Sequence, residues 1–105
     1  MAKIIWTEPA LERLDAIADY IAKDKPDAAD RLVRRIFERV DLLEQFPEIG
    51  RRVPEMRQSP YRELVVSPCR IVYRIEGDAV MIIFVIRGEQ ELRPQEIIKT
   101  DLEKI

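Results

Sequence analysis

A chain of 105 residues without a single histidine excludes Ser-His and Cys-His nucleophile pairs and imidazole-bound metal sites from the start. Its length fits one domain with one core, and a composition of 47% hydrophobic and 36% charged residues is typical of a soluble globular protein. The net charge of −2 argues against a general nucleic-acid binder, and the lone Cys69 excludes an internal disulfide and a cysteine-based zinc site, so we expect no cofactor.

The N-terminal part of the chain predicts a strand over residues 3–6 followed by a helix. Thr7 can cap that helix, and Pro9 is tolerated in its first turn. Apolar residues then recur at helical spacing: Leu11, Leu14, Ile17, Ala18 and Ile21. The first residues lack a signal-peptide pattern, and the longest apolar run, residues 79–86, is only strand-sized. We therefore expect a cytoplasmic protein that does not enter the membrane.

A second helix is predicted to begin near Pro26, and Pro47 and Gly50 stop it. It carries a wide apolar stripe: Ala29, Leu32, Val33, Ile36, Phe37, Val40, Leu43 and Phe46. Because only a short join separates the two amphipathic helices, they should form an αα-hairpin, one face of which needs a sheet to cover it.

Three runs rich in Val, Ile and Tyr supply that sheet as an antiparallel meander. We predict strands over residues 62–66, 69–75 and 79–86, separated by hairpin-length breaks. The last run is apolar on both faces, as expected of a central strand covered on both sides. The helical hairpin covers one side, and the C-terminal segment or a partner covers the other. That segment has one weak helical stripe, formed by Ile98, Leu102 and Ile105.

Positive charge is concentrated around the first two of these strands. Residues 51–74 carry six arginines and two acids, a net charge of +4, whereas the segments before and after each carry a net charge of −3. Arg70 and Arg74 should point to the same face of their strand with Val72 between them. They either face a partner, which we favour, or pair within the chain with Glu63 or Glu76. A local patch of this kind suits one anionic partner surface.

The other candidate side chains have weaker signals. Arg51 and Arg52 follow a helix, where arginines are often simply exposed. Arg62 at a strand start fits a structural ion pair, whereas Arg87 at a strand end before a glycine favours function. Cys69 fits a small buried apolar residue better than a reactive thiol.

The order of these elements and several short motifs resemble the RelE/ParE superfamily of bacterial toxins, and within it the ParE branch. The resemblance covers nearly the whole chain, residues 1–105, as one toxin domain. It is carried by the segments WTEPAL (residues 6–11), DYIA (19–22), FPEIGR (46–51), YRELVV (61–66) and RIVYRI (70–75). It implies an α+β fold with a short N-terminal strand and an αα-hairpin packed on a three-to-four-stranded antiparallel sheet.

The resemblance also implies a function: these are the toxic halves of type II toxin–antitoxin modules. A cognate antitoxin would bind the toxin in a hetero-oligomer, wrapping the sheet and hairpin with an extended or helical tail. ParE-type toxins inhibit DNA gyrase, whereas RelE-type toxins cut messenger RNA in the ribosome. RelE-like members use Arg and Lys on the meander plus a Tyr, His or further Arg near the C-terminus, and residues 86–94 here contain no Tyr or His but two acids.

We therefore favour a gyrase-binding toxin without an active site of its own. The residues expected to contact the target or the antitoxin are Arg51, Arg52, Arg70, Arg74 and Arg87. The alternative is a ribosome-dependent endoribonuclease that uses Arg62, Arg70 and Arg87, with Glu63 as a base. A third reading is a relative that binds an antitoxin but has lost its target, because Arg87 stands where ParE-like chains commonly have His and Cys69 where they have an aromatic residue.

Overall fold

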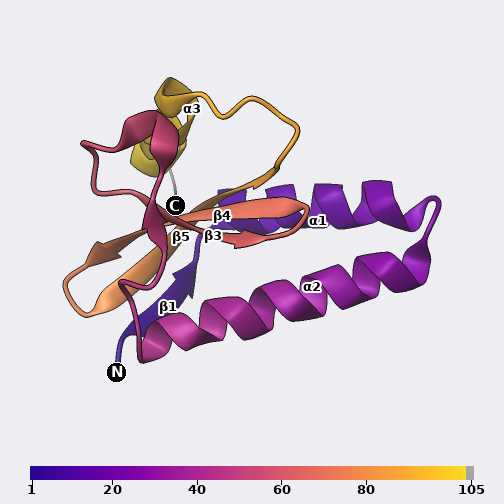
Figure 1. Ribbon diagram of the computed structural model, residues 1–105, viewed down its shortest axis with the longest axis horizontal. Coiled ribbons are helices and arrows are strands. Elements are labelled where there is room, and N and C mark those ends of the chain that lie inside the picture. Colours follow the sequence, from indigo (N-terminus) through magenta and orange to yellow (C-terminus); the bar gives the residue numbers. More distant parts are fainter. Residues whose placement is uncertain (104–105) are drawn as a thin grey trace.

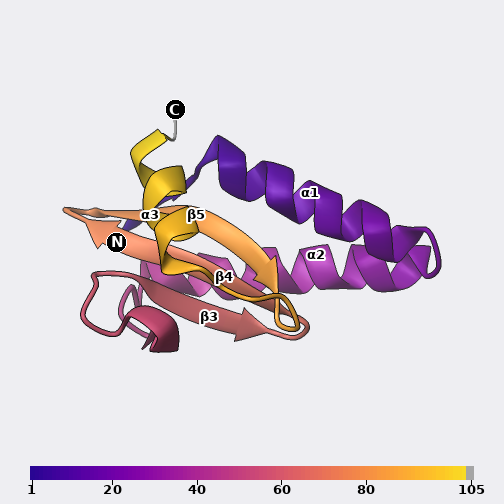
Figure 2. The ribbon, with the colours of Figure 1, turned by 90° about the horizontal axis from the view of Figure 1, so that it is seen from above.

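The computed structural model describes residues 1–103, in which a five-stranded sheet separates two helical layers (Figures 1 and 2). The strand order is β1-β5-β4-β3-β2, with β1 parallel to β5 and all other neighbours antiparallel. The strands are β1 (Lys3–Trp6), β2 (Arg51–Arg52), β3 (Arg62–Val66), β4 (Cys69–Glu76) and β5 (Ala79–Arg87).

The helical hairpin covers one face of the sheet. Helices α1 (Glu8–Ala22) and α2 (Pro26–Asp41) lie side by side (Figure 2), and a 3₁₀ turn, Leu42–Glu44, continues α2. Thr7 caps α1 by accepting a hydrogen bond from the Ala10 amide at 3.4 Å, and its hydroxyl donates to the Ile82 carbonyl at 2.6 Å. The predicted cap therefore also ties α1 to the central strand β5.

The C-terminal helix α3 (Pro94–Glu103) lies over the opposite face of the sheet (Figure 1), one of the two covers that the sequence allowed. The stripe predicted for this segment is wrong. Ile97 is fully buried, whereas Ile98 is 38% exposed and Leu102 81% exposed; Ile105 lies outside the described residues. The buried partner of Ile97 one turn later is Asp101, a polar residue that an apolar pattern does not identify.

The α+β class, the hairpin and the meander are confirmed, but the sheet has five strands rather than three or four and is mixed rather than antiparallel. β1 pairs with β5 across some 75 residues of chain, as Ile4 opposite Val80 illustrates. β2 has only two residues, too few to give a period in the sequence. No helix within residues 1–103 combines the length and apolar character needed to cross a membrane.

Candidate functional site

Arg70 and Arg74 point from the same face of β4, as predicted, and that face is the one that α3 covers. Their side chains are only 12% and 16% exposed. Each pairs with carboxylates of the same chain, Arg70 with Glu63 and Arg74 with Glu76 among others. Pairing within the chain, the alternative considered for these two arginines, is therefore what the structure contains.

Glu63 is the centre of the first network. Its side chain is completely buried, and its two oxygens accept hydrogen bonds from Arg51 Nε at 2.7 Å and Arg70 Nε at 2.8 Å. Arg70 also forms a bidentate pair with Glu55, at 2.7 and 2.9 Å. These bonds raise the pKa of Arg70, and the hydrogen bond from Arg70 lowers the pKa of Glu55. A buried carboxylate held by two guanidinium groups joins β2, β3 and β4.

Arg74 belongs to a second network, which joins β4 to α3. Its Nε donates to Asp101 at 2.7 Å, and the hydroxyl of Tyr61 donates to the same carboxylate at 2.6 Å. Burial, followed by the hydrogen bond to Asp101, raises the pKa of Tyr61. The bonds to Asp101 and Glu76 raise the pKa of Arg74. The side chain of Asp101 is 8% exposed, so this contact docks α3 on the sheet through a nearly enclosed ion pair.

The loop before β2 is held by hydrogen bonds to its backbone. Arg62 donates to the carbonyl oxygens of Glu48 and Gly50, at 3.2 and 2.9 Å, and these bonds stand in place of the ion pair predicted for it. The hydroxyl of Tyr73 donates to the Pro47 carbonyl at 2.8 Å and accepts from the Gly50 amide at 2.9 Å. Hydrogen bonds from Arg62 and with Tyr73 thus anchor the loop formed by residues 46–51.

Arg52 is exposed and donates to the Ser59 carbonyl at 2.7 Å. Arg51 has a side chain that is 59% exposed even though it reaches Glu63. These two arginines on β2 are the most accessible members of the cationic segment that the sequence singled out, together with the loop residue Arg57, which is also exposed.

Arg87 lies on the other face of the sheet. Its cross-strand neighbour is Cys69, which is buried in the core beneath the helical hairpin, and its guanidinium lies 4.8 Å from the centre of the Tyr20 ring. It pairs with Glu89, but its Nε is buried and has no hydrogen-bond partner among residues 1–103. Burial raises the pKa of the Cys69 thiol to about 11, which fits the buried apolar role expected of it.

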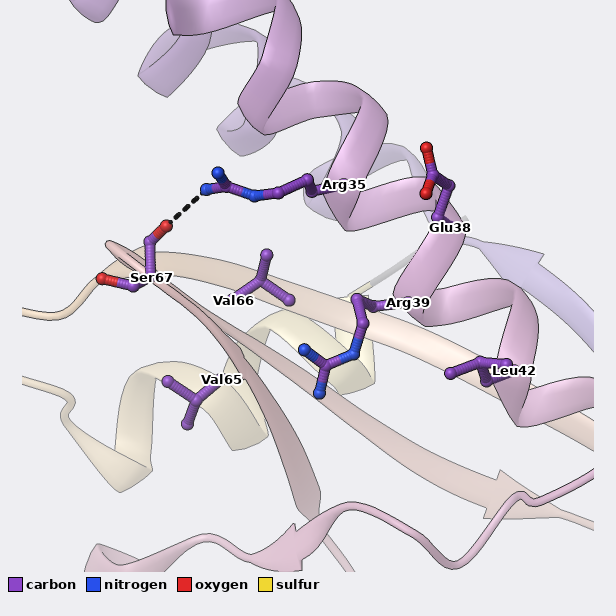
Figure 3. A pocket seen from close by; sticks show the side chains of 7 residues that line it. All are labelled: Arg35, Glu38, Arg39, Leu42, Val65, Val66 and Ser67. Carbon is purple, nitrogen blue, oxygen red and sulfur yellow. Dashed lines mark hydrogen bonds between the residues drawn. The ribbon is translucent and has the colours of Figure 1, made fainter.

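A groove runs between α2 and strand β3, and Figure 3 shows its walls. We call it the α2–β3 groove; it has a volume of about 750 Å³ and is lined by Arg35, Glu38, Arg39, Leu42, Val65, Val66 and Ser67. Leu42 and Val65 are 46% and 47% exposed. Arg35 crosses one end of the groove to donate to the Ser67 carbonyl at 2.8 Å (Figure 3). Because β2 pairs only with Arg62 and Glu63, the outer rim of the remaining three residues of β3 has no strand beside it within residues 1–103.

The sequence reasoning did not identify this groove, although α2 contains a usable signal. Arg31, Arg35 and Arg39 recur every four residues, which places three arginines on one side of a helix. The apolar stripe of α2 predicts only which side of the helix faces the core. The partners Glu55 and Asp101 were also missed, because pairing across 15 and 27 residues of chain leaves no local pattern.

Residues 4–92 match the sequence family described as the ParE toxin of type II toxin–antitoxin system, parDE. The chain belongs to this toxin family. It is 46% identical over 91 residues to the Y4kP protein of Sinorhizobium fredii, covering 85% of this chain and 91% of that one. It is 38% identical over 92 residues to toxin RelE2 of Caulobacter vibrioides, covering 88% of this chain and all of that one.

The fold of the family toxin is also found among solved structures. The chromosomal ParDE toxin–antitoxin system from P. aeruginosa matches with a TM-score of 0.70 and 29% identity, over 85% of this chain and 98% of that one. The resemblance to the RelE/ParE superfamily is therefore confirmed. The relatives carry both RelE and ParE names, since toxin ParE3 of Caulobacter vibrioides is 28% identical over 96 residues, so the names alone do not select one target.

Proposed function

We propose that this ParE-family toxin acts in the cytoplasm as a protein-binding inhibitor of DNA gyrase, and that a cognate antitoxin silences it by binding in the α2–β3 groove. The observation that carries the first half is the placement of the arginines that RNA cleavage would need. Arg70 points to the α3 face of β4, whereas Arg87 lies on the hairpin face. Arg62 is cross-strand to Tyr73, also a residue of the hairpin face.

An RNA phosphate would need free cations around it, and these arginines are engaged elsewhere. Arg70 already holds Glu55 and Glu63, and Arg62 holds two carbonyl oxygens. Glu63, the base considered for such a mechanism, is enclosed between Arg51 and Arg70 with no exposed side-chain surface. These placements favour binding over catalysis.

The five arginines proposed for binding would then have different tasks. Arg51, Arg52 and Arg87 keep exposed surface with which to contact gyrase or the antitoxin. Arg70 and Arg74 would contribute mainly by fixing the shape of the sheet face and by their charge, because direct contact would require them to leave their carboxylates.

The groove supports the second half of the proposal. Exposed Leu42 offers an apolar contact on the α2 side of the groove, and exposed Val65 offers one on the other face of β3, beside Arg70. The open rim of β3 can accept an added strand from an extended segment, whose side chains would alternate between these two faces. Arg35 and Arg39 give the groove a positive side. An extended antitoxin tail with alternating apolar and acidic residues has the matching chemistry.

Pulse-labelling of DNA and protein synthesis after induction of the toxin alone tests the target. We expect DNA synthesis to fall first while translation continues. A prior collapse of translation would instead identify a RelE-type endoribonuclease, and normal growth would identify a relative that has lost its toxicity.

A groove variant tests the antitoxin half separately. Val65→Asp should weaken capture of the protein encoded beside the toxin gene by about tenfold or more, because it places a carboxylate at an apolar contact. Leu102→Asp, the same kind of change at a more exposed position on α3, should leave capture unchanged. Equal capture by wild type and Val65→Asp would remove the groove from the antitoxin interface.

A further inference from the structure

Three arginines converge at a smaller pocket next to the α2–β3 groove. Arg31 and Arg35 of α2 and Arg87 of β5 line a space of about 330 Å³, which we call the arginine pocket. Its remaining walls are apolar, formed by residues such as Leu32 and Pro68, and no acidic residue is among its lining. Three positive charges are thus brought together in a chain whose net charge is −2, and a cleft lined by one sign of charge concentrates ions of the opposite sign.

The charges in the arginine pocket are only partly compensated. Arg87 pairs with Glu89, and Arg35 donates to the Ser67 carbonyl, a neutral group. Arg31 makes no ion pair or hydrogen bond with another side chain in residues 1–103, and the Nε of Arg87 is buried there without an acceptor. Exposed Arg31 and Arg35 keep donors that an added oxyanion can bind, and Arg87 adds positive charge to the same space.

We propose that the arginine pocket binds a single carboxylate, supplied by an acidic side chain of the antitoxin tail as it leaves the α2–β3 groove. The proposal rests on the proposed neutralisation by an antitoxin and adds the chemistry of one contact. Arg35 lines both the groove and the pocket, so a chain lying in the groove passes directly to the pocket. One guanidinium can bind a carboxylate in bidentate geometry, and the remaining lone pairs of the two oxygens can accept single hydrogen bonds from the other two guanidinium groups.

A protein carboxylate fits the surroundings better than a nucleic-acid backbone. Glu38 borders the groove and Glu89 adjoins Arg87, so a chain of phosphates running past the pocket would meet repulsion on both sides. Apolar walls accommodate the methylene groups of a Glu side chain. One acidic residue flanked by apolar residues satisfies both conditions.

Binding can be measured directly on the guanidinium groups. The probe is a blocked five-residue peptide, Ala-Leu-Glu-Leu-Ala, titrated into the full chain while the Nε–Hε resonances of its arginines are followed by NMR. We expect saturable shifts at Arg31, Arg35 and Arg87, and at least tenfold weaker binding of the same peptide with Gln in place of Glu. Equal binding of both peptides, or shifts at all arginines alike, would overturn the site.

Inorganic phosphate is the second arm of the titration. Phosphate that saturates the same resonances at least tenfold more tightly than the Glu peptide would overturn the carboxylate assignment in favour of a phosphate site. Weaker binding of phosphate than of the peptide supports the proposal. Neither result depends on what the toxin inhibits, so this test can fail while the gyrase proposal stands.

A matched pair of variants connects the pocket to the antitoxin. Arg31→Gln combined with Arg35→Gln should abolish the peptide-induced shift at Arg87 and weaken binding of the protein encoded beside the gene by about tenfold to a hundredfold. Arg34→Gln removes one positive charge from an exposed position of the same helix, outside the pocket lining, and should change neither. If Arg34→Gln weakened both as much per charge removed, general charge rather than the pocket would be responsible.

Discussion

At the scale of single residues, several arginines of this toxin hold the sheet and its loops together. Their guanidinium groups are therefore not free to bind a partner unless these contacts break. Arg70 spans Glu63 on the neighbouring strand and Glu55 on the loop beyond it, and Arg62 and Tyr73 fix the loop around Gly50. A substitution that removes such a side chain therefore changes stability as well as any surface it forms. Loss of toxicity in these variants has to be compared with their folding.

Arg70→Ala should lower the free energy of unfolding by about 3 kcal/mol, since breaking a buried pair leaves a carboxylate without one of its partners. Arg51 still holds Glu63, which limits the loss. Urea denaturation of the purified variant measures the change. An Arg70→Ala protein as stable as wild type would mean that the Glu63 network contributes nothing net to the fold.

Glu55 makes the stability of the toxin dependent on pH. Its pKa in the folded chain lies below the ordinary value of 4.5, because Arg70 donates to its carboxylate. Between these two pKa values the unfolded chain binds more protons than the folded chain, so stability is retained above pH 4.5 and falls as the pH drops through the folded pKa. Glu55→Gln should be less stable than wild type at neutral pH, and urea denaturation should show the difference shrinking below pH 4.5. A difference that is independent of pH would contradict the ion pair.

Gly50 is required because no side chain fits there. A Cβ at this position would lie 2.5 Å from the Tyr73 hydroxyl and 2.8 Å from the Glu63 carbonyl. Gly50→Ala should therefore destabilise the fold by about 1–3 kcal/mol, the usual cost of overpacking a close contact. Gly88→Ala is the control, because its Cβ would meet the Pro68 carbonyl at an ordinary 3.4 Å. Thermal unfolding of both variants should show a clear loss for Gly50→Ala alone.

At the scale of elements, α3 is attached differently from the helical hairpin. The hairpin buries a continuous apolar cluster, whereas α3 combines Ile97 with a polar contact, Asp101 to Tyr61 and Arg74. Polar contacts in a nearly enclosed place are directional, so they fix the position of a helix that buries few apolar side chains.

Tyr61→Phe removes one donor to Asp101 and should loosen α3 specifically. We expect a loss of about 1 kcal/mol in stability and faster amide exchange across α3, with exchange in α1 and α2 unchanged. Tyr20→Phe is a suitable comparison, because Tyr20 is 59% exposed and lies on the opposite face. Hydrogen exchange followed by mass spectrometry resolves the helices. Uniform acceleration throughout the molecule would indicate global destabilisation and contradict a local role for the hydroxyl.

At the scale of the whole molecule, local sequence patterns predicted most of the helices and strands. Ion pairs between residues far apart in the sequence could not be predicted in this way. Helices α1 and α2 and the meander follow from apolar periodicity and turn residues, and the role of Thr7 follows from capping chemistry. The buried side of α3 does not, because it combines Ile97 with Asp101. The sequence also named Glu63 and Glu76 as possible partners of Arg70 and Arg74. The more distant partners Glu55 and Asp101 could not be predicted, because a carboxylate far along the chain leaves no spacing that sequence reasoning can use. The groove depends on how short β2 is, which only the folded arrangement determines.

The short β2 strand also affects how the toxin behaves on its own. Three residues of β3 end the sheet with backbone groups that another chain can bond, next to the apolar side chains of Leu42 and Val65. Two copies could pair through this rim, so we expect a concentrated preparation of the toxin alone to self-associate. The solubility of the toxin would then depend on a bound partner that covers this rim. A cell that makes toxin and antitoxin together would avoid the loss of free toxin to aggregates.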